Sequence, residues 1–176
     1  MRTLYGTFLA AALVLPGSLV AQSKDAAKAL DDSVIVGIFD AANTWDIATG
    51  SLAATRAARQ DVKDFGAMLA RDHKFVRDSA RKLAAKVNVA PVAVPADFPL
   101  KVAHEAAMKT LSALSGPAFD KAFLEHEVAY HKAVGDALNK SLLPAMKSPE
   151  LKAFVTQVAP AFAAHQLAAE TLLKKQ

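Results

Sequence analysis

The chain has 176 residues, a formal net charge of +4 and a hydrophobic content of 53%. A chain this apolar can bury a core, so disorder is not its default state. Its basic residues are interspersed with acidic ones, as in Lys63-Asp64 and Arg71-Asp72, which favours solvated helix faces over a nucleic-acid-binding surface. The absence of cysteine excludes disulfides and thiolate metal sites.

The first 21 residues are organised like a secretory signal peptide. Arg2 precedes an apolar run from Phe8 to Leu15, and the small residue Ala21 precedes the expected cleavage site. The apolar run is shorter than the about 20 residues that a membrane-spanning helix needs. We therefore expect a signal peptide over residues 1–21, export to the periplasm, and no membrane span after cleavage.

Residues 22–30 are a polar, alanine-rich lead-in that we expect to be flexible, and residues 31–176 are expected to form one domain. Capping side chains at 31–33 precede a first helix that is predicted to run to about Ala57. After a short break, a second helix is predicted to end at Asn88. The prolines that follow cannot continue it, so residues 89–97 are expected to be an extended connection.

A shorter helix is predicted over residues 98–114, with Asp97 as its N-cap and Pro99 in its first turn. Residues 115–117 interrupt this helix and begin the third long helix. Pro144 is predicted to end the third long helix.

The fourth long helix is predicted to begin at Pro149 with Ser148 as its N-cap, and Pro160 inside it predicts a kink. No segment shows the alternating pattern of a strand. Four long amphipathic helices with mostly short connections predict an all-α fold. The expected architecture is an up-down four-helix bundle with a short extra helix before the third long helix.

Each long helix carries one polar side chain within its apolar stripe, namely Asp46, His73, His131 and His165. Each lies three, four or seven residues from apolar residues of its own helix, which places it on the buried face. With a helical rise of 1.5 Å per residue, Asp46 and His73 lie about 18 and 22 Å from the turn between their helices. By the same count, His131 and His165 lie about 22 and 28 Å from theirs. Because burial without partners is costly, the four side chains are expected to meet.

Two interpretations of this set remain open. Three imidazoles and one carboxylate suit one Zn²⁺, Fe²⁺, Mn²⁺ or Cu²⁺ ion as cofactor. The alternative is a polar core without metal, in which the same groups hydrogen-bond to one another, or histidines half exposed at helix edges. The methionines do not cluster, which argues against a thioether copper site.

Neighbouring residues are candidates for supporting contacts to this set, and they are Trp45, Asp72, Glu127 and Tyr130. His104 and His126 are expected at the surface or at a helix edge. The paired Glu-x-x-His motifs of a di-iron centre are absent, and so are the HExxH motif, the nucleophile elbow and the phosphate loop. No catalytic residue is therefore predicted.

Three segments carry a resemblance to a known family. They are VKDFGAMLARDHKF around His73, LSGPAFDKAFLEHEVAYHKAV around His131 and APAFAAHQLA around His165. Through them the chain resembles, over residues 33–173, a bacterial family of exported proteins known as Domain of Unknown Function 4142. The resemblance implies a ferritin-like bundle and no established activity. The family usually has Glu where this chain has Asp46, and a DH pair where it has Tyr130-His131.

Two functions from different classes are consistent with these observations. The first is a periplasmic bundle that stores, buffers or senses one transition-metal ion, with the four polar residues as ligands. The second is a structural or interaction protein of the cell envelope, related to stress, in which the polar core specifies the register of the helices. Envelope proteins are the expected partners, and association with the outer membrane stays an alternative. The sequence identifies no substrate and no oligomeric state.

Overall fold

The computed structural model describes residues 30–175, and all regular secondary structure in that range is helical. The elements are α1 (Asp32–Arg56), α2 (Gln60–Lys86), α3 (Pro99–Ala113), α4 (Gly116–Ala137), the π-helical turn η1 (Leu138–Leu142), α5 (Leu143–Ala145) and α6 (Pro149–Leu173). The all-α class is confirmed. The predicted signal peptide and residues 22–29 of the lead-in lie outside the described residues.

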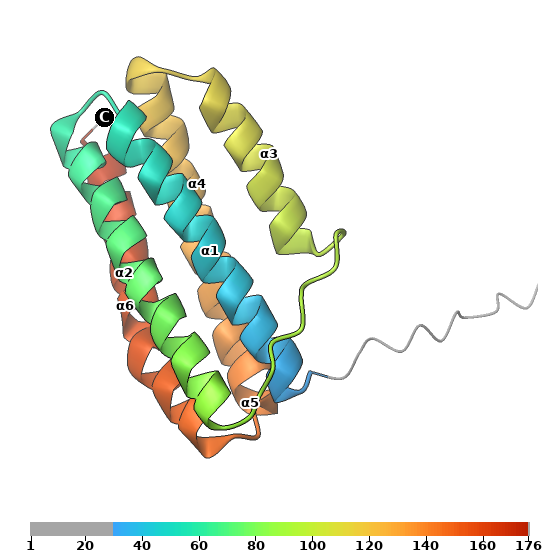
Figure 1. The fold of residues 1–176 in the computed structure, drawn as a ribbon. Helices are drawn as coiled ribbons and strands as arrows, with labels where there is room; N and C mark the ends of the chain where they lie inside the picture. Colours follow the sequence, from blue (N-terminus) through green and yellow to red (C-terminus); the bar gives the residue numbers. More distant parts are fainter. Residues whose placement is uncertain (1–29, 176) are drawn as a thin grey trace, which may run out of the picture.

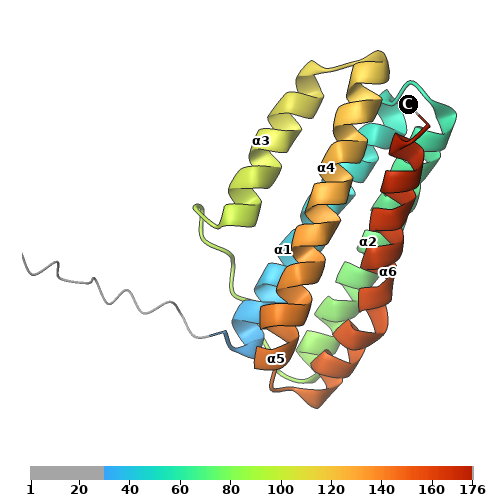
Figure 2. The ribbon, with the colours of Figure 1, turned by 180° about the vertical axis from the view of Figure 1, so that it is seen from behind.

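The four long helices α1, α2, α4 and α6 lie side by side, and α3 packs beside α1 and α4 (Figures 1 and 2). Helix α1 is paired mainly with α2, and α4 is paired mainly with α6. Among the helices that the structure describes, none combines the length and the apolar character needed to cross a membrane.

The order of helix directions differs from a simple up-down succession, which is not confirmed. Helices α2 and α4 run in the same direction, because the segment 87–98 and α3 carry the chain back to the other end (Figure 1). Helix α1 runs opposite to α2, and α6 runs opposite to α4. The extra helix was expected from the sequence, but its effect on the direction of the next helix was not.

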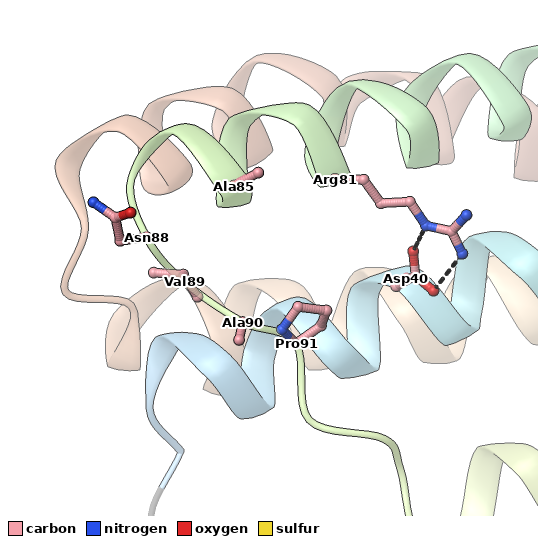
Figure 3. Close-up of a pocket in the computed structure, with 7 residues that line it drawn as sticks. All are labelled: Asp40, Arg81, Ala85, Asn88, Val89, Ala90 and Pro91. Atoms are coloured by element: carbon pink, nitrogen blue, oxygen red, sulfur yellow. Dashed lines mark hydrogen bonds and ion pairs between the residues drawn. The ribbon is translucent and has the colours of Figure 1, made fainter.

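The connection after α2 begins at Asn88, whose φ of 57° turns the chain out of the helix. Figure 3 shows this turn beside an ion pair in which Arg81 of α2 donates to Asp40 of α1 at 2.9 Å. These two side chains satisfy each other and are, among the described residues, the only charged ones that line the pocket there. That pocket is therefore not the candidate site.

Two helix starts follow the predicted capping pattern and one does not. Asp31 accepts from the backbone N–H of Val34, and Ser148 accepts from that of Leu151. The predicted cap Asp97 is wrong, since Phe98 is the N-cap of α3 and makes no side-chain capping bond. The ring of Phe98 packs on Trp45 instead, with 6.4 Å between the ring centroids.

Two turns of the bundle, the one between α1 and α2 and the one before α6, are each held by a carboxylate from the opposite helix pair. Asp120 of α4 is fully buried and accepts from the backbone N–H groups of residues 58 and 59, at 2.8 and 2.9 Å, in the α1–α2 turn. Asp32 of α1 accepts from those of residues 147 and 148, both at 2.8 Å, before α6. These bonds fix the position of one helix pair along the bundle axis relative to the other pair.

Helices α1 and α2 approach most closely where two glycines face each other. A Cβ atom on Gly50 would lie 2.6 Å from the carbonyl oxygen of Gly66, and one on Gly66 would lie 2.7 Å from that of Gly50. Both contacts are with backbone, which cannot move aside as a side chain does. The two glycines therefore set the α1–α2 distance, with Gly50 about one turn after Asp46 and Gly66 about two turns before His73.

Adding a methyl group at this contact should destabilise the protein. For Gly66→Ala we expect the free energy of unfolding to fall by about 1–3 kcal/mol, because the two helices must separate. Gly135→Ala in α4 is the matched control, since a Cβ atom there meets nothing within 4 Å. That control should be neutral or stabilising by about 0.5–1 kcal/mol, through helix propensity. Urea unfolding of both variants measures the difference, and equal effects would contradict the packing argument.

Candidate metal centre

The structure brings the four predicted site residues together in the interior. Oδ2 of Asp46 lies 3.1 Å from Nε2 of His73 and 3.4 Å from Nε2 of His131. Nδ1 of His165 lies 3.2 Å from Nε2 of His73. All four residues are buried, with His165 the most exposed at 7%. One polar side chain from each long helix therefore faces a common point.

The site lies in a polar layer between two apolar clusters of the core. On one side the apolar packing includes Ala42, Val76, Tyr130 and Phe162, and on the other it includes Ala53, Leu69, Leu124 and Ala169. Each long helix contributes one residue to each of these two sets and a polar residue between them. The polar layer comprises the buried residues Asn43, Asp46, Thr49, His73, Glu127, His131 and His165.

Asn43 determines which nitrogen of His73 faces the site. Its amide nitrogen donates to the backbone carbonyl of Phe39 at 2.8 Å, so its oxygen faces Nδ1 of His73 at 2.9 Å. An amide oxygen only accepts, and Nδ1 of His73 therefore carries the proton. Nε2 of His73 is left with its lone pair directed at Asp46.

His131 is oriented in the same way by a carbonyl of its own helix. Its Nδ1 lies 3.0 Å from the backbone oxygen of Glu127, which fixes the proton on Nδ1. Its Nε2 is buried and has no hydrogen-bond partner among the described residues. The lone pair on this nitrogen also points toward Asp46.

His165 approaches from the edge of the layer. Its Nε2 faces Oδ2 of Asp72 at 3.4 Å, and Asp72 is partly exposed to solvent. Because Nε2 of His73 carries no proton, Nδ1 of His165 donates to it at 3.2 Å in the metal-free protein. In the other tautomer the proton is on Nε2, which faces Asp72, and the lone pair of Nδ1 is free to bind a cation. His73 and His131 thus each have an oxygen on Nδ1 and a lone pair on Nε2, which is the arrangement that orients metal-ligating histidines.

Two carboxylates in this layer lack hydrogen-bond partners. All four carboxylate oxygens of Asp46 and Glu127 are buried and accept no hydrogen bond from the described residues. Burial raises the pKa of Asp46 well above its usual value, and the charge of Glu127 raises it further. Burial also raises the pKa of Glu127, but the neighbouring His131, His126 and Thr49 together outweigh this and hold the pKa below its ordinary value.

His73 and His165 resist protonation. Burial, together with the neighbouring His131 and His165, lowers the pKa of His73 to about 2. Burial is also the largest cause of a lowered pKa at His165. Neutral imidazoles are the form in which histidine binds metal. Ligand-type atoms of the three histidines lie within 4.8 Å of one another, as do those of Asp46, Glu127 and His131.

The supporting residues agree only in part with the sequence analysis. Asp72 and Glu127 contact the histidines as expected, and Tyr130 donates to the backbone carbonyl of Ala42 at 2.8 Å rather than to the site. Asn43 was missed, although it lies three residues before Asp46 on the same helix face. Its signal was weak because a buried asparagine is not a usual metal ligand.

The placement of His104 was wrong, whereas His126 is half-buried at a helix edge as expected. His104 is 8% exposed and stacks on Trp45, with 5.7 Å between ring centroids. The residues next to His104 in the sequence do not show that Trp45, which is distant along the chain, covers it.

Comparison with known proteins adds the family. A family model described as Domain of unknown function (DUF4142) matches residues 18–172, which confirms the resemblance found in the sequence. No curated protein and no solved structure matches the chain.

The lowered pKa of His73 predicts acid destabilisation of the metal-free protein. The unfolded chain takes up a proton at His73 near pH 6.5, whereas the folded protein resists until about pH 2. Unfolding is therefore favoured as the pH falls below 6.5, by about 1.4 kcal/mol per pH unit for this histidine. Between pH 7 and pH 5, with chelator present, the wild type should lose about 2 kcal/mol more than His73→Gln in urea unfolding. Parallel pH profiles for the two proteins would contradict this assignment.

Proposed function

The chain belongs to the Domain of unknown function (DUF4142) family, and we propose that it is an exported periplasmic protein that binds one transition-metal ion in its core. The proposed ligands are Asp46, His73, His131 and His165. The expected ions are divalent Zn, Fe, Mn or Cu, because imidazole and carboxylate ligands suit them. Storage, buffering or sensing of the ion is the role that this supports, and no reaction is proposed.

One observation carries the proposal, namely that lone pairs converge in the polar layer. Nε2 of His73 and Nε2 of His131 present lone pairs, and Oδ2 of Asp46 lies 3.1 Å from the first and 3.4 Å from the second. Nδ1 of His165 lies 3.2 Å from Nε2 of His73 and joins them as a ligand when its proton is on the nitrogen that faces Asp72. Groups that only accept hydrogen bonds repel one another at these distances. A cation at their centre turns the same arrangement into four favourable contacts.

The charge of the layer favours a divalent ion. The three histidines are neutral when they act as ligands, and Asp46 and Glu127 together supply two negative charges in a region from which water is excluded. Isolated charges in such a region are costly unless they are compensated. A divalent ion neutralises both carboxylates.

The proposal includes the architecture and the location of the protein. We propose a four-helix bundle of the ferritin-like kind, which has one long crossover connection, here formed by residues 87–115. We also propose that residues 1–21 are a cleaved signal peptide and that residues 31–176 are one domain in the periplasm. The signal-peptide pattern of the sequence supports this location, and association with the outer membrane is the alternative.

The second candidate is a structural or interaction protein of the cell envelope without metal. The raised pKa of Asp46 favours it, because a protonated Asp46 carboxyl can donate to Nε2 of His73 at 3.1 Å. In that case the polar layer only specifies how the helices align. The two candidates differ in whether the purified protein holds metal.

Metal analysis of the purified protein without a His tag tests the proposal. We expect about one divalent ion per chain, and a melting temperature that falls on chelation, because a ligand that binds only the folded state stabilises it by about 2.7 kcal/mol at 100 times its Kd. His131→Ala should lose the ion. His126→Ala on the same helix is the matched control and should keep it, since His126 lies outside the site.

The opposite set of results would contradict the metal proposal. If the protein holds no metal, gains no stability from added Zn²⁺, Fe²⁺, Mn²⁺ or Cu²⁺, and melts unchanged after chelation, the metal proposal is wrong. The search then turns to envelope partners.

Asn43 provides an independent prediction. In Asn43→Leu, the N–H of His73 Nδ1 loses its acceptor. The tautomer with a lone pair on Nε2, which is the one that binds metal, is then no longer favoured. We expect the affinity for Zn²⁺ to fall about 10- to 100-fold, the range found when partners of ligating histidines are removed. Calorimetric titration measures the affinity, and ¹⁵N NMR of the imidazole reports the tautomer. Unchanged affinity together with a changed tautomer would contradict this role.

A further inference from the structure

We infer that Glu127 is a positioning residue whose buried charge makes the centre prefer divalent over monovalent cations. This inference rests on the proposed metal site and goes beyond it, because it assigns the ion class to a residue that is not among the proposed ligands. Glu127 lies in α4, one helical turn before His131.

The first argument is the position of the Glu127 carboxylate relative to His131. Oε2 of Glu127 lies 3.4 Å from Nδ1 of His131, and the backbone oxygen of Glu127 lies 3.0 Å from the same nitrogen. The carboxylate thus faces the protonated side of the ring, opposite the Nε2 that points to Asp46. The backbone carbonyl orients the imidazole, and the negative charge of the carboxylate beside Nδ1–H makes the other nitrogen a stronger ligand.

The second argument is the burial of the charge. Glu127 is 0% exposed, and neither of its carboxylate oxygens accepts a hydrogen bond from the described residues. One of these oxygens also lies within 4.8 Å of ligand-type atoms of Asp46 and His131. A charge so close, without solvent screening, acts on any cation in the layer.

The third argument is the charge balance. With Asp46 and Glu127 ionised and the histidines neutral, the layer carries two negative charges, which a divalent ion neutralises and a monovalent ion leaves at −1. Replacing Glu127 by glutamine removes one of them. The layer then becomes neutral with a monovalent ion and carries +1 with a divalent ion, so the ratio of the Zn²⁺ affinity to the Ag⁺ affinity should fall.

The test compares Zn²⁺ with Ag⁺ on the full folded protein. For Glu127→Gln, which is nearly isosteric, we expect the affinity for Zn²⁺ to fall about 10- to 100-fold. The affinity for Ag⁺ should be unchanged or higher. Glu125→Gln is the matched control on the exposed face of α4 and should change neither affinity. Glu127→Asp keeps the charge and should retain the preference for Zn²⁺.

Three results would overturn the inference. Equal losses for Zn²⁺ and Ag⁺ in Glu127→Gln would indicate a structural role without charge selection. A changed visible band pattern of bound Co²⁺ in Glu127→Gln would make Glu127 a direct ligand. If Glu127→Gln does not fold, a Glu127→Asp protein that has lost the preference for Zn²⁺ overturns it as well. A wild type that binds neither ion instead contradicts the metal site itself, so the two failures are distinguishable.

Discussion

The structure depends on one constraint, which is that a layer of ionisable side chains lies in the middle of the core with apolar clusters on both sides. Water cannot reach Asp46 or Glu127, so each polar atom of the layer must find its partner within the protein or in a bound cation. A shift of one helix by a single residue would turn its polar group toward an apolar neighbour. The layer therefore fixes the register of all four long helices at once.

Other features of the fold serve the same alignment. The glycine contact between α1 and α2 holds their two backbones at one distance, and Asp120 and Asp32 tie each turn to the opposite helix pair. The crossover through α3 has a further effect, because it makes α4 run parallel to α2. His73 of α2 and His131 of α4 therefore lie on two parallel helices. Their ring centroids are 5.5 Å apart in the polar layer.

Periodicity alone was sufficient to find Asp46, His73, His131 and His165, because each lies within an apolar stripe and the stripe defines the buried face. Periodicity does not show what the second nitrogen of a histidine contacts, so the hydrogen bond between Asn43 and His73 could not be predicted. It also does not give the direction of a helix after a crossover, and so α4 was expected antiparallel to α2. His104 was misplaced for a similar reason, since Trp45, from a distant part of the chain, covers it.

The contacts around the histidines indicate how binding and stability are connected. His73 and His131 are each held by an oxygen on Nδ1, so their inner lone pairs are in place before any ion arrives, and little ordering of these two rings is needed on binding. The same low dielectric that strengthens contacts to a cation makes the layer unfavourable without one. Stability and ion affinity therefore arise from the same buried charges, and a change to any residue of the layer alters both.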